Sequence, residues 1–210
     1  MIQTIQAKNI TLGDLIANFG IELVEDEQFF REWQDNQPEI TELDRQLLDR
    51  LKAGFINLLN YPPLLEDLVR MSVLDPLLFL AGFYLSPFHV KSEKSVAITS
   101  EDEEVLITGS LDSLVLRDRL WVMAIEAKKA EFSIEAGLAQ LLAYMLAAPD
   151  PAQPGFGMIT TGGNFIFVKL VCNPKPRYAL SDQFTLRKRQ NELYCVLKIL
   201  KRLGQQILKN

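Results

Sequence analysis

The chain has 210 residues, of which 48% are hydrophobic and 23% charged, so it has the composition and length of a globular domain with a real core. A formal net charge of −5 argues against a general nucleic-acid coat protein. The single histidine, His89, argues against histidine-rich metal sites and most histidine-based triads. Two cysteines, no long apolar run and no charged-then-apolar leader predict a cytoplasmic protein without a membrane segment.

Charge is unevenly distributed along the chain. Residues 1–60 hold 11 Asp/Glu against 5 Lys/Arg, whereas residues 183–210 hold 7 Lys/Arg against one acid, Glu192. A basic tail is compatible with a local nucleic-acid surface or, equally, with a solvated helix face. Both interpretations stay open at this point.

The first half of the chain predicts helices. Residues 1–40 form an N-terminal extension with a short helix between a Thr11 N-cap and a Gly20 stop. From Thr41 an apolar helical period predicts a long helix with one buried face, followed by a helix over 64–71 and another that starts at Asp75-Pro76. The residues expected on the buried face of the long helix are Leu43, Leu47, Leu48, Leu51, Phe55, Leu58 and Leu59.

The second half alternates strands and helices. Strands are predicted over 88–98, 104–116 and 120–128, then a helix over 133–147. Two strands flank a Gly162-Gly163 hairpin turn, residues 172–182 form a loop, and a long amphipathic helix closes the chain. This order predicts an α/β protein with a mixed central sheet, in which residues 41–210 form one domain carrying the extension.

Acidic residues interrupt the second and third strands. If these strands form a hairpin centred near Asp118, paired residues have numbers that sum to about 236, so Asp112, Glu126 and Lys128 share one face. Cross-strand diagonal neighbours lie about 7–8 Å apart, close enough for two carboxylates to share Mg²⁺, a hard cation that prefers oxygen ligands. A bound metal and an adjacent ammonium suit phosphodiester hydrolysis. A charged strand end that simply meets solvent is the plainer alternative.

The helix after the third strand adds a second signal. Gln140 and Tyr144 are four residues apart and so share one helical face. Gln140 stands among leucines, and burying it would require hydrogen-bond partners. The plainer alternative is an exposed glutamine beside a half-buried tyrosine.

These residues, in this order, resemble the PD-(D/E)xK nuclease superfamily, whose restriction endonuclease-like core has the order αβββαβ. The resemblance matches Asp112 to the family's Asp, Glu126-Ala127-Lys128 to its (D/E)xK, and Gln140 to Tyr144 to the QxxxY element of its RecB-like branch. It covers residues 42–171, roughly 60% of the chain. The same stretch also resembles the N-terminal nuclease domain of type I restriction enzyme R subunits.

The resemblance implies a Mg²⁺-dependent endonuclease, with Mn²⁺ able to substitute. Asp112 and Glu126 would bind the metal, Lys128 would orient water or stabilise the transition state, and Gln140 and Tyr144 would support the site. The family often uses an acid on its first core helix, for which Glu66 is the candidate, with Glu93 on the first strand as another.

The chain departs from the family pattern in two ways. Leu111 stands where the family name has Pro, a substitution that the family often tolerates. No helicase motor or Walker-type phosphate loop follows, so a role in type I restriction is not implied as a whole.

The expected partner is DNA, and a homodimer is one expected assembly because cutting both strands often calls for two sites. The first alternative is a catalytically inactive member of the fold, acting with protein partners as an accessory factor in DNA rearrangement or host defence. The second is an unrelated carboxylate enzyme such as a sugar hydrolase, against which Lys128 and the lack of an aromatic-rich cleft both argue.

Overall fold

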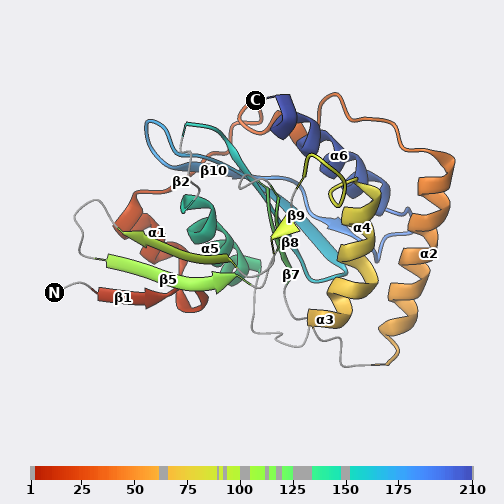
Figure 1. Ribbon diagram of the computed structural model, residues 1–210, viewed down its shortest axis with the longest axis horizontal. Coiled ribbons are helices and arrows are strands. Elements are labelled where there is room, and N and C mark those ends of the chain that lie inside the picture. Colours follow the sequence, from red (N-terminus) through yellow and green to blue (C-terminus); the bar gives the residue numbers. More distant parts are fainter. Residues whose placement is uncertain are drawn as a thin grey trace.

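The computed structural model describes residues 3–61, 66–88, 90–91, 94–99, 105–111, 114–116, 120–124, 134–147 and 152–209. The helices and helical turns are η1 (Ala7–Asn9), α1 (Leu12–Phe19), η2 (Arg31–Trp33), α2 (Glu42–Leu58), α3 (Glu66–Val69), η3 (Arg70–Leu74), α4 (Asp75–Leu80), α5 (Ile134–Leu146) and α6 (Leu193–Lys209). The strands are β1 (Gln3–Gln6), β2 (Glu22–Leu23), β3 (Val90–Lys91), β4 (Lys94–Thr99), β5 (Val105–Leu111), β6 (Leu114–Leu116), β7 (Leu120–Ala124), β8 (Gly155–Thr160), β9 (Asn164–Val171), β10 (Arg177–Leu180) and β11 (Phe184–Thr185). The chain is therefore a mixed α/β protein, as predicted (Figure 1).

The described strands form two sheets. The large sheet has the order β2-β10-β9-β8-β7-β6-β3, with β11 added beside β9, and the small sheet has the order β1-β5-β4. In the large sheet β6 pairs antiparallel with β3 and with β7. β7 and β8 pair in parallel, and α5 connects them in the chain. The predicted hairpin at Gly162-Gly163 is confirmed, because β8 and β9 pair antiparallel on either side of it.

Two of the predicted strands contribute to both sheets. The segment 90–99 supplies β3 to the large sheet and β4 to the small one, and the segment 105–116 supplies β5 and β6 in the same way. Paired residue numbers sum to 206 in the large sheet (Lys91↔Val115) and to 205 in the small sheet (Lys94↔Leu111). The pairing register of the described residues therefore differs by one residue between the two sheets.

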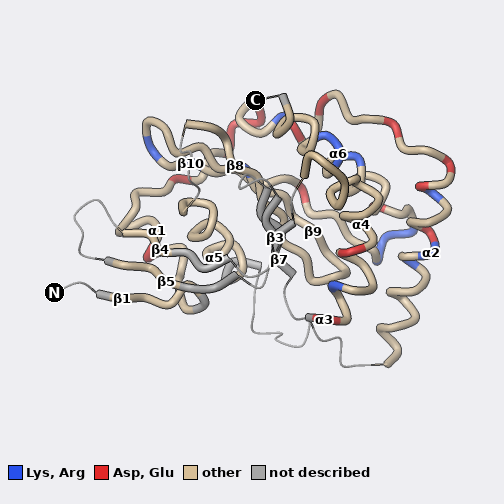
Figure 2. The backbone as a smooth tube through the Cα atoms, viewed as in Figure 1, with Lys and Arg blue, Asp and Glu red and all other residues tan. Residues whose placement is uncertain are grey.

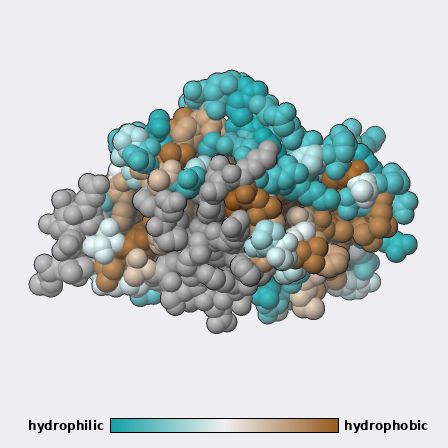
Figure 3. Space-filling model, turned by 45° about the horizontal axis from the view of Figure 1, so that its top comes forward, coloured by the Kyte–Doolittle hydropathy of each residue, from teal (hydrophilic) through white to brown (hydrophobic). Residues whose placement is uncertain are grey.

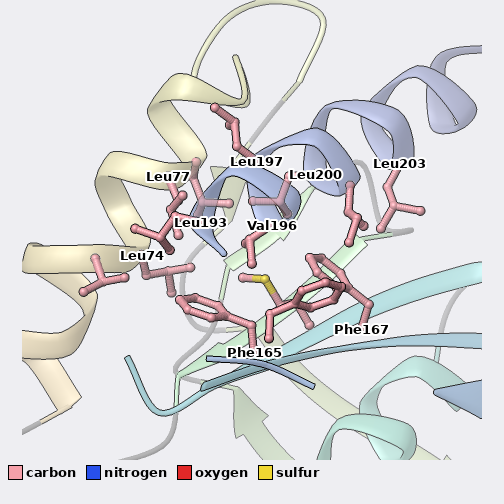
Figure 4. Close-up of a cluster of buried hydrophobic side chains, with 14 of the residues drawn as sticks. Leu74, Leu77, Phe165, Phe167, Leu193, Val196, Leu197, Leu200 and Leu203 are labelled. Carbon is pink, nitrogen blue, oxygen red and sulfur yellow. The ribbon is translucent and has the colours of Figure 1, made fainter. Parts of the chain in front are cut away.

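The two faces of the large sheet pack against different helices. Phe156, Met158, Phe165 and Phe167 join the core formed with η3, α4 and α6. Their neighbours Ile159, Val168 and Leu170 join a second core formed with α5 and α1. The alternation follows from the two-residue period of a strand, and Figure 4 shows α6 and α4 lying over Phe165 and Phe167.

Helix α5 lies between the large sheet and the N-terminal elements (Figure 1). Every residue from Gly137 to Met145 is buried except Gln140, which is half-buried. A Cβ added at Gly157 would lie 2.8 Å from Leu141 Cδ2 and 2.9 Å from Met145 Sδ, so the glycine permits α5 to lie directly on β8. A helix buried all round is almost uniformly apolar, which explains the leucine- and alanine-rich sequence.

The predicted helix starts of α1 and α2 are confirmed. Thr11 and Thr41 are N-caps whose hydroxyl oxygens accept from the backbone amides of Asp14 and Asp44. In return, the carboxylate of each aspartate accepts from the backbone amide of its threonine. These reciprocal bonds satisfy amides that have no partner within a helix. The predicted stop at Gly20 is also confirmed, since Gly20 adopts the left-handed conformation with φ of 60°.

Two helix predictions are wrong in detail. Leu43 is 65% exposed, because the buried residue in the first turn of α2 is Asp44, which pairs with Lys201 of α6. α4 begins at Asp75 as predicted, but Asp75 is not an N-cap, because it has helical φ and ψ of −59° and −44° and α3, η3 and α4 run on without a break. η3 is a π-helical turn in which the Asp75 amide donates to the Arg70 carbonyl, and this wider turn carries the helix past Pro76.

The predicted loop over 172–182 is also wrong in part. Residues Arg177–Leu180 form β10, which pairs antiparallel with β9 and in parallel with β2. The prolines at 174 and 176 suggested a loop, but they lie before the strand, where they remove no ladder bond. The closing helix α6 is confirmed, with its six predicted inward residues at most 2% exposed: Leu193, Val196, Leu197, Leu200, Leu203 and Ile207.

Two helical glycines predict opposite effects of the same substitution. A Cβ at Gly204 in α6 would lie 2.8 Å from the buried ring of Phe83, whereas a Cβ at Gly54 in α2 would meet nothing within 4 Å. Gly204→Ala should destabilise the protein by roughly 1–3 kcal/mol through overpacking, and Gly54→Ala should stabilise it by up to about 1 kcal/mol through helix propensity. Urea unfolding of both variants checks this pair, and stabilisation by Gly204→Ala would contradict the packing described.

Within the described ranges, no helix combines the length and the apolar composition needed to cross a lipid bilayer.

Candidate functional site

The hairpin of β6 and β7 has the register that the predicted site requires. Leu114 pairs with Val122, Val115 with Trp121 and Leu116 with Leu120. Each pair of numbers sums to 236, the value predicted for a hairpin centred on position 118. Because a slip of one residue would move every side chain to the other face, this register is the condition on which the shared face of Asp112, Glu126 and Lys128 depends.

The three predicted catalytic residues lie outside the described residues. Asp112 follows the last residue of β5, and Glu126 and Lys128 follow Ala124, the last residue of β7. Glu93 and the side chain of Glu66 are also outside the described part. That these predicted site residues lie close together therefore stays a prediction. The described residues define only the segments next to them in the chain.

One end of the large sheet brings several described segments together. Ala124, at the end of β7, pairs in parallel with Thr160, at the end of β8. The turn Thr161–Asn164 follows Thr160 directly, so it belongs to the same end of the sheet, here called the carboxyl edge. Active sites of open sheets commonly lie outside the carboxyl ends of parallel strands.

The first core helices pack on this edge. Gly162 has a φ of 80°, and a Cβ there would lie 2.8 Å from Val69 Cγ1 of α3 and 2.9 Å from Phe55 Cε2 of α2. The Gly162 amide donates to the buried Thr160 hydroxyl at 2.9 Å, which fixes the turn. Glu66 begins α3 one turn before Val69, so the backbone of this predicted acid starts close to the carboxyl edge.

The sequence predicted the hairpin turn but not its contact with the helices. The signal available was the glycine pair itself, since a glycine at positive φ often marks a close approach of another segment.

Gln140 and Tyr144 lie together on α5, as their spacing predicts. Gln140 Nε2 donates to Tyr144 Oη at 3.2 Å. Tyr144 is 1% exposed and Gln140 is half-buried, so the alternative of an exposed glutamine beside a half-buried tyrosine is wrong. The pair is built into the interior beside β7 and β8, and its role in a reaction stays a prediction.

Acidic residues from the first 60 positions form ion pairs with basic residues of the C-terminal helix α6. Lys201 Nζ of α6 lies 3.0 Å from Asp44 Oδ2, and Lys198 Nζ lies 3.3 Å from Glu39 Oε2. Lys169 on β9 forms a further pair with Glu32 at 2.6 Å. These ion pairs join the two oppositely charged regions, so the cations at positions 198 and 201 already have partners within the chain.

The pKa of Asp44 reflects this pairing. Burial alone would raise it, but hydrogen bonds from the Thr41 amide, the Lys201 ammonium and the Thr41 hydroxyl outweigh burial and lower the pKa below its ordinary value. A carboxyl with a lowered folded-state pKa stabilises the fold above its unfolded pKa, and that contribution is lost as pH falls through the folded-state pKa.

Asp44→Asn should therefore destabilise the protein by roughly 1–3 kcal/mol at neutral pH. The difference from the unmodified protein should shrink as pH falls from about 5 to 2. Urea unfolding across this range measures it, with the exposed Glu42→Gln in the same helical turn as control. An Asp44→Asn penalty that is constant down to pH 2 would contradict the ion-pair origin.

A groove of about 830 Å³ lies on another part of the surface, between α2 and the run of η3 and α4. Its walls include Leu47, Leu51, Met71 and Phe79, and brown surface marks hydrophobic side chains on this side of the molecule (Figure 3). Its few polar groups, such as Arg50 and Asp75, do not form the carboxylate set that phosphodiester hydrolysis requires.

The described residues contain no cluster of three His, Cys, Asp or Glu side chains that could hold a metal ion. Cys172 and Cys195 are free thiols, and burial raises the pKa of Cys172, so this thiol is a poor nucleophile. A search against models of known protein families found no match, and no curated protein matches the chain.

Proposed function

We propose that the protein is a metal-dependent nuclease that hydrolyses DNA phosphodiester bonds. Asp112 and Glu126 would hold Mg²⁺, and Lys128 would position the attacking water or stabilise charge on the phosphate. Gln140 and Tyr144 would support the strand that carries Glu126 and Lys128. When bound, Mg²⁺ supplies charge neutralisation and a water of lowered pKa.

The observation that carries this proposal is the register of β6 and β7. If the sum of 236 over three described pairs continues, position 112 lies opposite Ala124, two residues beyond the pair Leu114↔Val122. Positions 126 and 128, which also have even numbers, would share that face in a continuing strand. The donor set fits a hard cation, because it consists of carboxylates and contains no histidine.

The order and direction of the strands add support. A helix followed by three antiparallel strands, a crossover helix and a parallel strand is the αβββαβ order of restriction endonuclease-like proteins. Here α2 to α4 are followed by the segments 90–99, 105–116 and 120–124, then α5 and β8. The contact of α3 with the turn at Gly162 supports Glu66 as an additional acid at the same edge.

Incubation of the purified protein with supercoiled plasmid and with branched DNA tests the proposal. We expect nicked or linear products with Mg²⁺ or Mn²⁺ and none with EDTA. Calorimetry should show uptake of Mn²⁺ that Asp112→Asn abolishes. If neither substrate is cut and no divalent ion binds with Asp112 and Glu126 intact, the nuclease proposal fails and the inactive accessory protein becomes the better explanation.

A further inference from the structure

The basic residues of the chain's tail form one group in α6, which also holds Arg202 and Lys209, and a second group before it. In α6, Lys198 and Lys201 pair with Glu39 and Asp44. The other group is the basic loop, residues 187–190, with the sequence Arg187-Lys188-Arg189-Gln190. In Figure 2 its three cations form a continuous blue stretch beside α2.

The backbone of the basic loop is fixed at both ends and in its middle. Before it, the Leu186 amide donates to the Gly163 carbonyl at 2.9 Å, and after it the Asn191 side chain donates to Asp49 at 2.9 Å. In between, Lys52 Nζ of α2 donates to three successive carbonyls, those of residues 188, 189 and 190, at 2.5, 3.2 and 3.1 Å. The loop is therefore held in place by contacts from α2 and from the β8–β9 turn.

Of the three basic side chains in the loop, one forms an ion pair with a described residue and two do not. Lys188 pairs with Glu192 at 2.7 Å, and Glu192 also accepts from the Thr185 amide. Asp49 accepts from Tyr194 and Asn191. Arg187 and Arg189 are exposed, and neither guanidinium has a hydrogen bond or ion pair among the residues the structure describes.

The basic loop is continuous with the carboxyl edge of the large sheet. It follows β11, which pairs with the first residues of β9 at Phe165 and Asn164, directly after the turn that ends β8. The bond from Leu186 to Gly163 joins the loop to the same turn. Two guanidinium groups without a partner among the described residues thus stand on a fixed loop attached to the edge where the proposed chemistry would occur.

We propose that Arg187 and Arg189 bind the phosphate backbone of duplex DNA and hold it across the carboxyl edge. This inference rests on the proposed function. Arginine presents a rigid fork of donors that matches phosphate oxygens, and a backbone contact of this kind positions the duplex without reading its sequence. On a chain with a net charge of −5, a local pair of exposed cations gives a polyanion a preferred point of approach.

Fluorescence anisotropy with a labelled 20-base-pair duplex in Ca²⁺ or EDTA tests the inference separately from cleavage. Arg187→Gln/Arg189→Gln should bind on the order of tenfold more weakly at 50 mM salt, and the slope of log K against log salt should fall by about 2, since each phosphate contact contributes about 0.9. Lys175→Glu is the matched control. It changes net charge by the same amount but lies in the β9–β10 turn, at the opposite end of β9.

The possible results separate the two proposals. Loss of binding in the double variant but not in Lys175→Glu supports the inference, whether or not the unmodified protein cleaves DNA. Equal binding and an unchanged salt slope in the double variant overturn it, even if the unmodified protein is a nuclease. Absence of any DNA binding by the unmodified protein overturns both, and matching thermal unfolding of the variants excludes a folding defect as the cause.

Discussion

Lys128→Ala is expected to lower the rate of Mg²⁺-dependent DNA cleavage by about 10²–10³-fold, the usual cost of removing one group that stabilises developing charge. Lys129→Ala should leave the rate within about twofold, because in the strand predicted to reach this point successive residues would point to opposite faces. Initial rates of plasmid nicking measure both effects. The two variants remove the same charge from adjacent positions, so a general electrostatic effect on DNA affinity would change both alike.

Binding of metal separates the two roles further. Lys128→Ala should still take up Mn²⁺ in calorimetry, since the lysine is not a ligand, whereas Asp112→Asn should not. Equal losses of activity in Lys128→Ala and Lys129→Ala, or full activity in Lys128→Ala, would contradict the assigned role of Lys128.

Leu48→Ala should destabilise the fold by about 2–5 kcal/mol, the usual cost of a cavity in a packed core. Leu48 is completely buried in the core between α2, α6 and the large sheet. The same substitution at Leu43, in the same helix but 65% exposed, should change the free energy of unfolding by less than about 0.5 kcal/mol.

Guanidinium unfolding of both variants measures this difference. Similar losses at the two positions would mean that the first turn of α2 packs on the core, as the helical period alone suggests. A loss confined to Leu48→Ala would support the orientation described, in which Asp44 replaces a leucine as the buried residue of that turn.

The long helices and the β6–β7 and β8–β9 hairpins were predictable, because strong local patterns determine them. The strands β1 and β2 in the N-terminal extension and the separate small sheet were not predicted. The closing helix α6 has apolar residues at helical spacing, and all six predicted positions are buried. The register of β6 and β7 could be predicted because a short turn leaves little freedom in how two strands align. The contact between Gln140 and Tyr144 followed from their spacing of four residues.

The features that escaped prediction depend on partners far away in the sequence. Leu43 fits the helical period of α2, and only the ion pair of Asp44 with Lys201 shows which side of the first turn faces inward. β10 is four residues long and follows two prolines, so its sequence alone resembles a loop, and it becomes a strand because β9 and β2 flank it. The catalytic arrangement itself remains a prediction from the sequence, supported by the register beside it.

The pairing of the chain's beginning with its end has a consequence for folding. β2 pairs with β10 (Glu22 with Arg177), and Asp44 bonds to Lys201 across 157 positions. Closing such long loops costs entropy before the contacts form, which slows folding. During synthesis β2 and the first turn of α2 should therefore form these contacts only after β10 and α6 have left the ribosome. Truncation at the C-terminus should destabilise both of these regions together.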